Sequence, residues 1–321
     1  MNLRVTVSPH IRGKDTTGRI MTDVIIALLP TLIAGTLIFT YRALLVTAVS
    51  VLAALAGEFV YHLVSREPGN LKNMSAVVTG LLLALTLPVT VPYHIPLVGG
   101  FFATFVVKGI GGRLGHNCFN PALASRALLM LLFPVGMVRF TAPFGILPAG
   151  NIDPADIITS ATPLHTMQMP ALPRVELTDL LLGKTGGCIG EVCTVALLVG
   201  GAYLVFRKVI SLRIPGAYLL TVALLTLIFA KDENVVAWMA YSLLSGGVML
   251  GAIFMATDYA SSPVEQTAQI VYGAGCGVLT VVFRYFGLFP EGVTYAILMM
   301  NGIAPLLDRL FARRIYGAKK G

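Results

Sequence analysis

Charge is scarce in this sequence: Asp, Glu, Lys and Arg make up only 12% of 321 residues, whereas hydrophobic residues make up 56%. A water-soluble domain of this length needs a far more charged outer shell. Apolar runs of roughly 20 residues, the length that crosses a hydrocarbon core, recur along the chain. The composition therefore excludes an ordinary soluble protein and predicts a multi-pass protein whose surroundings are membrane lipid.

Cysteine and the common catalytic motifs are also scarce. The four cysteines, Cys118, Cys188, Cys193 and Cys276, show no Cys-x-x-Cys spacing, so we do not expect this chain alone to hold an iron–sulfur cluster. The sequence has no Walker loop, Gly-x-Ser-x-Gly or His-Glu-x-x-His motif. The residues therefore predict neither a catalytic group nor a metal site.

A net charge of +8 raises the question of nucleic-acid binding. The basic residues are scattered in short segments between apolar runs and are not gathered on one face with interleaved aromatic residues. We therefore expect lipid, and no nucleic acid, around this chain.

Ten membrane-spanning helices are predicted from the apolar runs. The third run contains Pro88 and Pro92, which interrupt helical hydrogen bonding, and the fourth carries Lys108 near its end. The predicted spans are 20–40, 43–64, 74–91, 95–112, 119–138, 185–206, 214–230, 235–257, 266–286 and 291–311.

The distribution of Lys and Arg predicts the orientation. Most of these residues fall in segments on the side of the two termini, so both termini are expected to be cytoplasmic. The segment 141–184, rich in proline and too long for a simple hairpin, is then expected outside the cell membrane.

Alignment of the two halves indicates an internal repeat, with a chance match of apolar segments as the alternative. Gly80, Thr86 and Pro92 match Gly251, Thr257 and Pro263 at a constant offset of 171 residues. Because each unit would hold an odd number of spans, the second copy would be inverted in the membrane. The sequence therefore predicts an all-α membrane protein with a cytoplasmic segment 1–19, five-helix repeats 20–140 and 185–311, the external segment 141–184 and a cytoplasmic tail 312–321.

The repeat also points to an interior site. Glycine and proline interrupt the paired segments 75–88 and 245–258. Irregular backbone survives at membrane depth only where protein or a cavity satisfies its polar groups. We therefore expect both segments near the centre of the bilayer, lining a cofactor or ion site.

The external segment contains the stretch DIITSATPLHTM, residues 156–167. Read alone, it predicts a hydroxyl-rich turn. It resembles the flavinylation motif of the Rnf and Na⁺-translocating NADH:quinone reductase families, although Ser160 stands where glycine is common. That resemblance implies FMN joined through its phosphate to Thr162, with Thr159 and Ser160 in the same motif.

The resemblance extends over nearly the whole chain. Segments SPHIR (8–12), SAVVTGLLLALTLP (75–88), GGRLGHNCFNPALASRALL (111–129), GAIFMATDYASSP (251–263) and FPEGVTYAILMMNGIAPLLDR (289–309) are similar to signature segments of the RnfD family and of its paralogue in the Na⁺-translocating NADH:quinone reductase. It implies a flavin-dependent electron-transfer component of a complex that couples ferredoxin:NAD chemistry to Na⁺ or H⁺ translocation. The partners that it implies are the sibling components A, B, C, E and G of the Rnf complex.

The same resemblance implies a second flavin. In the paralogue a non-covalent riboflavin lies near an Asn-x-x-Asn-Pro segment, which corresponds here to Asn117, Asn120 and Pro121. An asparagine amide offers the donors and the acceptor that suit the edge of a flavin ring. Asn120 before Pro121 is equally typical of a helix N-cap, and the two roles are compatible.

Acidic residues in or beside the predicted spans are candidates for ion coupling. Glu58, Asp258 and Asp308 lie within or at the inner ends of spans, and Glu191 lies within the sixth. Such residues cost roughly 2.5–3.5 kcal/mol on insertion scales, so each needs a partner or a function. A helix cap or an ion pair is the structural alternative for each of them.

Two other functions fit parts of this pattern. The chain could belong to the quinone-linked paralogue, or it could be a secondary transporter without a redox role, because an inverted repeat suits both. The flavinylation motif favours a redox protein.

Overall fold

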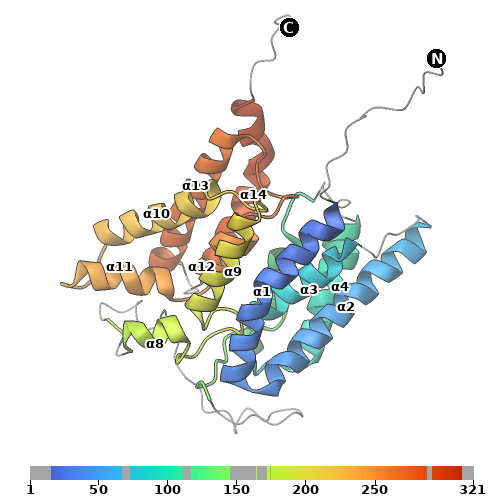
Figure 1. Cartoon of the computed structure of the whole chain (residues 1–321), viewed down its shortest axis with the longest axis horizontal. Coiled ribbons are helices and arrows are strands. Elements are labelled where there is room, and N and C mark those ends of the chain that lie inside the picture. The colour runs from blue at the N-terminus through green and yellow to red at the C-terminus, as the bar shows by residue number, and fades with distance from the viewer. Residues whose placement is uncertain are drawn as a thin grey trace, which may run out of the picture.

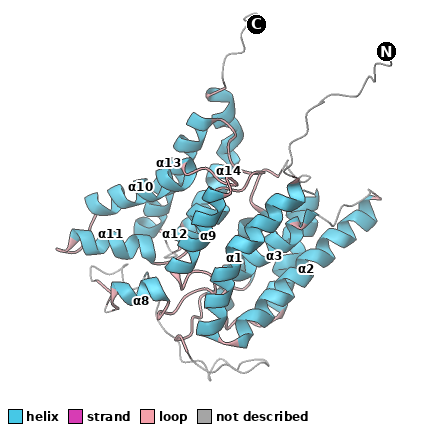
Figure 2. Cartoon of the chain, in the orientation of Figure 1, coloured by secondary structure: helices cyan, strands magenta, loops and turns pink. Residues whose placement is uncertain are grey.

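The computed structural model describes residues 16–66, 73–110, 117–144, 164, 172–173, 175–287 and 291–312. Every regular element in these ranges is a helix, and they contain no β-strand (Figure 2). The prediction of an all-α protein is confirmed for the described part of the chain.

The first half of the chain supplies one group of helices. They are α1 (Thr17–Phe39), α2 (Tyr41–Ser65), α3 (Ser75–Leu85), α4 (His94–Phe102), the π-helix η2 (Ala103–Ile110) that continues α4, α5 (Pro121–Leu132) and the short α6 (Pro134–Met137).

The second half supplies the other group. Its helices are α8 (Leu177–Leu182), α9 (Thr194–Phe206), α10 (Arg213–Ile228), α11 (Val235–Leu244), α12 (Val248–Leu250), the π-helix η4 (Gly251–Met255), α13 (Gln266–Phe286) and α14 (Val293–Leu310).

Several of these helices are long and apolar enough to cross a membrane. Helices α1, α2 and α13 meet that condition individually, and α11 with residues 248–255 forms a fourth candidate bent by 62°. Large apolar side chains such as Leu37, Phe206 and Phe286 point outward, with Phe286 86% exposed. An apolar exterior of this kind is stable in lipid and unstable in water, which indicates a multi-pass membrane protein.

Helix α1 runs between two ends of the molecule, whereas α10 and α11 lie more nearly across that direction (Figure 1). The first turn of α1 and the last turn of α14 lie toward the same end, which we call the termini end. Helix α8 lies at the opposite end, which we call the α8 end.

The third predicted span, 74–91, is wrong in its length, because α3 ends at Leu85. The chain beyond α3 is irregular and buried, and its carbonyl groups need donors. The guanidinium of Arg42, which is 0% exposed, donates from Nε to the carbonyl oxygen of Val89 (2.9 Å) and from Nη2 to that of Val91 (3.3 Å). One buried arginine therefore stabilises this break.

The eighth predicted span, 235–257, is likewise interrupted. Helix α11 ends before Ser245, and Gly246 adopts a left-handed φ of 66°, which favours glycine. Arg284 of α13 donates to the carbonyl oxygens of Ser242 and Ser245, the latter at 2.9 Å. A second buried arginine thus stabilises the second break.

The sixth predicted span, 185–206, begins too early, since α9 starts at Thr194. Residues before it are irregular, and their amides bond to the end of α3: Ile189 N donates to Leu87 O (3.0 Å) and Gly190 N to Leu85 O (2.7 Å). These partners lie about a hundred residues away in sequence, so local patterns do not reveal them.

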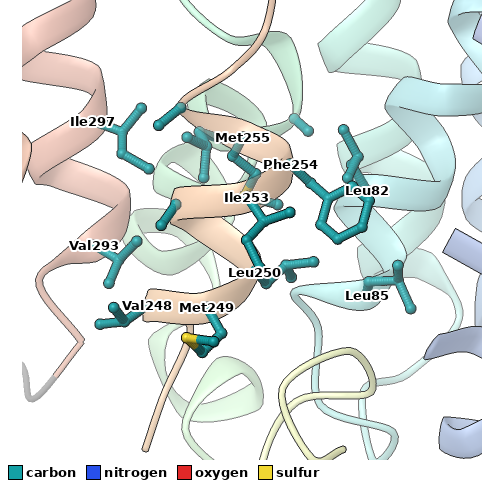
Figure 3. Packing of buried hydrophobic residues seen from close by; sticks show 14 of the residues in the cluster. Leu82, Leu85, Val248, Met249, Leu250, Ile253, Phe254, Met255, Val293 and Ile297 are labelled. Atoms are coloured by element: carbon teal, nitrogen blue, oxygen red, sulfur yellow. The ribbon is translucent and has the colours of Figure 1, made fainter. Parts of the chain in front are cut away.

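The core lies where the two interrupted segments meet. Leu82 and Leu85 of α3 face residues 248–255, with Phe254 and Leu250 nearest to them (Figure 3). Most side chains of 75–88 and 245–256 are buried in this cluster. Neither paired segment faces lipid, as expected for segments that line an interior site.

Close helix contacts hold each half together. A Cβ added to Gly100 of α4 would lie 2.4 Å from the carbonyl oxygen of Ser50 in α2, and one added to Gly273 of α13 would lie 2.7 Å from that of Ile214 in α10. Only glycine permits backbones to approach so closely. In each half, two helices therefore meet at a glycine, where no side-chain atom separates their backbones.

The role of Arg42 gives a test of the first break. Replacing Arg42 with Met would leave the carbonyls of Val89 and Val91 without that donor, at a cost of about 1–3 kcal/mol for each buried group. We expect a clearly lower melting temperature of the detergent-solubilised protein. Arg309→Met, at an exposed arginine of α14, is the matched control. Equal melting temperatures for the two variants would contradict the assigned role.

Candidate functional site

A pocket of about 310 Å³ opens at the termini end, and we call it the first pocket. It lies between α1, α3, the start of α5 and the loop that follows η4. Its walls are apolar with a few polar groups, which is typical of ligand sites. The lining residues are Thr17, Ile20, Met21, Ser75, Val78, Thr79, Leu82, Lys108, Asn117, Asn120, Pro121, Ala122, Asp258, Tyr259 and Ala260.

Asn120 lines the pocket and also joins the two halves of the chain. Its Oδ1 accepts from the amides of Ala122 (3.0 Å) and Leu123 (3.3 Å), so it is the N-cap of α5. Its Nδ2 donates to the carbonyl oxygen of Met255 (3.1 Å) at the end of η4. The cap predicted from sequence is confirmed, and Asn117 lies in the same pocket, also buried.

Lys108 supplies a buried positive charge to this pocket. Its Nζ donates to Glu58 and to Ser75 Oγ, the latter at 2.5 Å, and both charged side chains are largely buried. Glu58, an ion-coupling candidate, therefore lies just behind the pocket wall as the partner of Lys108. The sequence pattern assigns Lys108 no function, although an ionisable residue within a span is itself a signal.

Asp258 lies in the loop after η4 and lines the first pocket. Its Oδ2 accepts from Ser261 Oγ at 3.0 Å. Burial raises the pKa of the Asp258 carboxyl, and hydrogen bonds from Ser261 and the Ala260 backbone offset part of that rise. The ion-coupling candidate Asp258 thus shares a pocket with Asn117 and Asn120.

Asp308 lies elsewhere. Its carboxylate accepts from the amides of Val264 (3.0 Å) and Glu265 (3.0 Å) at the start of α13. A carboxylate is favourable at a helix N-terminus because it satisfies amides that have no helical partner. The structure therefore shows Asp308 as a cap for α13 and does not bring it into the first pocket.

The flavinylation motif, with Thr159, Ser160 and Thr162, lies outside the described residues. Leu164, two residues after Thr162, is described: it is 5% exposed and packs beside Leu180 and Gly246. Because Leu180 belongs to α8, Leu164 lies at the α8 end.

A second group of ionisable side chains was not predicted as a unit from the sequence. Arg126 of α5 pairs with Glu291 and lies 3.8 Å, Nη1 to Oε1, from Glu191. Its Nη2 is 3.7 Å from Cys188 Sγ. We call these four residues the Arg126 cluster. Arg126 lies in the middle of α5, where its pair with Glu291 connects the two halves.

Comparison with known proteins identifies the family. The family model described as NQR2, RnfD, RnfE family matches residues 4–317. The chain belongs to this family. Within the NQR2, RnfD, RnfE family, it is 45% identical to the D component of the Na(+)-translocating ferredoxin:NAD(+) oxidoreductase complex of Acetobacterium woodii, over 100% of this chain and 97% of that protein.

Two further relatives align with this chain over almost its whole length. The D component of the proton-translocating ferredoxin:NAD(+) oxidoreductase complex of Clostridium ljungdahlii is 34% identical over 98% of this chain and 96% of its own length. The D component of the ion-translocating oxidoreductase complex of Alcanivorax borkumensis is 37% identical over 99% of this chain and 98% of its own length. The names of the Acetobacterium and Clostridium relatives specify different coupling ions.

The Glu58–Lys108 pair gives a test of the wall of the first pocket. Removing one partner of a buried ion pair leaves an uncompensated charge, at about 3–5 kcal/mol, whereas replacing both with apolar side chains is often nearly neutral. We expect Lys108→Met alone to destabilise the protein strongly, and Glu58→Leu with Lys108→Met to recover much of that loss. Thermal unfolding in detergent measures both. Additive effects of the two substitutions would show that the residues do not act as a pair.

Proposed function

We propose that this chain is the membrane electron-transfer component of an ion-translocating ferredoxin:NAD oxidoreductase of the Rnf type, with covalent FMN and the sibling components A, B, C, E and G. The observation that carries the proposal is full-length similarity, at 45% identity, to a protein named as the D component of such a complex. The motif around Thr162 supports a redox protein over a secondary transporter without a redox role, and the names of the relatives support it over the quinone-linked paralogue.

The proposed architecture is a pair of inverted five-helix repeats, 20–140 and 185–311, in the cell membrane. The starts of α2, α3, α4 and α5 precede those of α10, α12, α13 and α14 by 172, 173, 172 and 172 residues. The packing is mirrored as well: α2 packs on α3 and α4, and α10 packs on η4, which matches the second half of α3 in the repeat, and on α13. Helices α1 and α5 each contact their own repeat mates, α9 and α14, as elements beside a pseudo-twofold axis do.

The proposed orientation has both termini in the cytoplasm and the segment 141–184 on the outer face. The excess of Lys and Arg on the side of the termini supports it. The arrangement of the helices is consistent with termini on one side, since α1 begins and α14 ends at the termini end. Leu164 packs at the opposite end, beside α8.

FMN is proposed to be joined to Thr162 by a phosphoester, with Thr159 and Ser160 completing the motif. The covalent bond would keep the flavin on the outer face without a dissociation equilibrium, and bound FMN supplies one- and two-electron chemistry. Leu164, two residues after Thr162, is buried and lines a cavity with Leu180 of α8 and Gly246 of the break before α12, which supports attachment on the side of α8.

The first pocket is the proposed site of a non-covalent riboflavin. Its volume of about 310 Å³ lies at the lower end of the range for small-molecule sites, roughly 300–1,000 Å³. Apolar residues such as Met21 and Leu82 fit the faces of a flat ring. The amides of Asn117 and Asn120 fit its polar edge, so the residues present suit the group.

The first pocket also supports a role in ion coupling. Asp258 in its lining and Glu58 behind it are carboxylates near the membrane end where a cytoplasmic ion would enter, and Asp308 lies at the same end. Lys108 between Glu58 and the pocket would make the charge on Glu58 sensitive to charge in the pocket. Relatives named for Na⁺ and for protons leave either ion open for this chain.

The attachment of FMN is tested by Thr162→Ala. The variant is expected to lose the fluorescent flavin band in denaturing electrophoresis while the protein still inserts, because alanine has no hydroxyl to carry the phosphoester. Thr166→Ala, at the next threonine after the proposed attachment residue, is the control and is expected to keep the band. Flavin that stays covalent in Thr162→Ala, or a flavin mass that maps to another residue, would refute the assignment.

The carboxylates are tested by Glu58→Gln, Asp258→Asn and Asp308→Asn in vesicles that contain the assembled complex. We expect Asp258→Asn to raise the Na⁺ concentration needed for half-maximal electron transfer and to lower ion uptake, because a neutral amide binds a cation more weakly. Unchanged Na⁺ dependence and uptake in all three variants would leave these residues structural.

A further inference from the structure

A small cavity of about 20 Å³ lies at the α8 end, next to the Arg126 cluster. That is enough volume for one water-sized particle. Its polar lining comes from Thr185, Gly186, Gly187, Glu191, Ser245 and Glu291. Leu164 and Leu180 form an apolar part of the wall.

Two buried oxygen atoms at this cavity have no hydrogen-bond partner among the described residues. They are Oγ of Ser245, a residue 1% exposed, and Oε1 of Glu191, a residue 7% exposed. A buried polar atom without a partner costs about 1–3 kcal/mol, so such atoms in a shared cavity indicate a bound particle. Both atoms have lone pairs that can bind a cation, and the carboxylate of Glu291 lines the same cavity.

The charges around the cavity favour a weakly held cation. Arg126 is paired with Glu291 and stays 3.8 Å from Glu191, beyond hydrogen-bond distance. Arg284 directs its Nη atoms to backbone carbonyls of Ser242 and Ser245. Of the two carboxylates at the cavity, Glu191 therefore has the weaker direct contact with a positive charge. The two arginines nearby lower the affinity for a cation, as a site from which an ion must leave requires.

The cavity occupies the place that the repeat assigns to a mate of the first pocket. Ile20, Met21, Ser75 and Asn120 line the first pocket, and the residues 171 positions later line the cavity: Glu191, Val192, Gly246 and Glu291. In an inverted repeat, two such sites face opposite sides of the membrane. At the positions that match Ile20 and Asn120 of the first pocket, the cavity therefore has the carboxylates of Glu191 and Glu291.

We propose that this cavity is the outer transit site for one dehydrated monovalent cation of the size of Na⁺, with Glu191 and Ser245 as ligands. Oxygen donors suit a hard cation, and the volume excludes an ion that keeps a water shell. The inference rests on the proposed function, because it assigns the release side of the ion path. It is separate from the first pocket, which lies at the other end of the molecule.

The test uses the assembled complex in proteoliposomes with Na⁺ set independently on the two sides. Na⁺ on the α8 side should inhibit electron transfer, because a filled transit site slows release. Ser245→Ala, which removes one ligand with little change in volume, should raise the half-inhibitory Na⁺ concentration by about tenfold or more. The requirement for Na⁺ on the termini side should stay the same. The broadening of the ²³Na resonance by the purified complex should fall in parallel.

Glu191→Gln tests the second ligand, and Asp179→Asn is the matched control. Asp179 is a carboxylate at the α8 end that pairs with Lys184 outside the cavity, 3.7 Å away. The control should behave like the wild type, and Glu191→Gln like Ser245→Ala. If Glu191→Gln does not assemble, Ser245→Ala decides.

The proposal is overturned if Ser245→Ala retains wild-type inhibition and ²³Na broadening. It is also overturned if, in the wild type, Na⁺ on the α8 side does not inhibit electron transfer and the complex does not broaden the ²³Na resonance. Both results leave the proposed function standing if flavin attachment and ion uptake persist. A wild-type complex without covalent flavin and without ion uptake would instead refute the proposed function itself.

Discussion

The need to satisfy every buried backbone carbonyl dominates this structure. Lipid offers no hydrogen bonds, so a helix that stops inside the bundle requires donors from the protein. The chain meets this need with Arg42 after α3 and Arg284 beside the end of α11. These guanidiniums stabilise two irregular segments in an apolar core. The first pocket and the Arg126 cluster lie next to those segments or next to the helices that begin beside them.

The two halves are joined by a few polar contacts across an otherwise apolar interface. Asn120 reaches Met255, Arg126 reaches Glu291, and Arg207 of the second half pairs with Asp23 of α1 at 3.1 Å. Such contacts are directional and satisfy buried groups, so they fix the relative register of the halves more than they add stability. The candidate sites lie on this interface because the half-helices end there.

Helices with uniform apolar composition are the part of the fold that the sequence predicts well. Helices α1, α2 and α13 begin and end within three residues of the predicted spans, since their own hydrogen bonds determine them. The breaks at Leu85 and before Thr194 are not predicted correctly, because their amides and carbonyls bond to residues distant in sequence. The grouping of Asn117, Asn120 and Asp258 in one pocket follows from no local pattern, although each residue is a candidate on its own. Glu191 is likewise a candidate alone, and its association with Arg126 and Glu291 depends on folding of the second half against the first.

The glycine contacts within each half have a mechanical consequence. Gly100 against Ser50 and Gly273 against Ile214 leave no space for sliding, so α2 with α4, and α10 with α13, form stiff pairs. Between the halves, α1 and α9 meet just as closely, since a Cβ added to Gly200 would lie 2.0 Å from the carbonyl oxygen of Ala27. At Asn120 and Arg126, in contrast, single side chains reach across. Deformation during turnover is therefore expected as rocking of one stiff body against the other about the close α1–α9 contact.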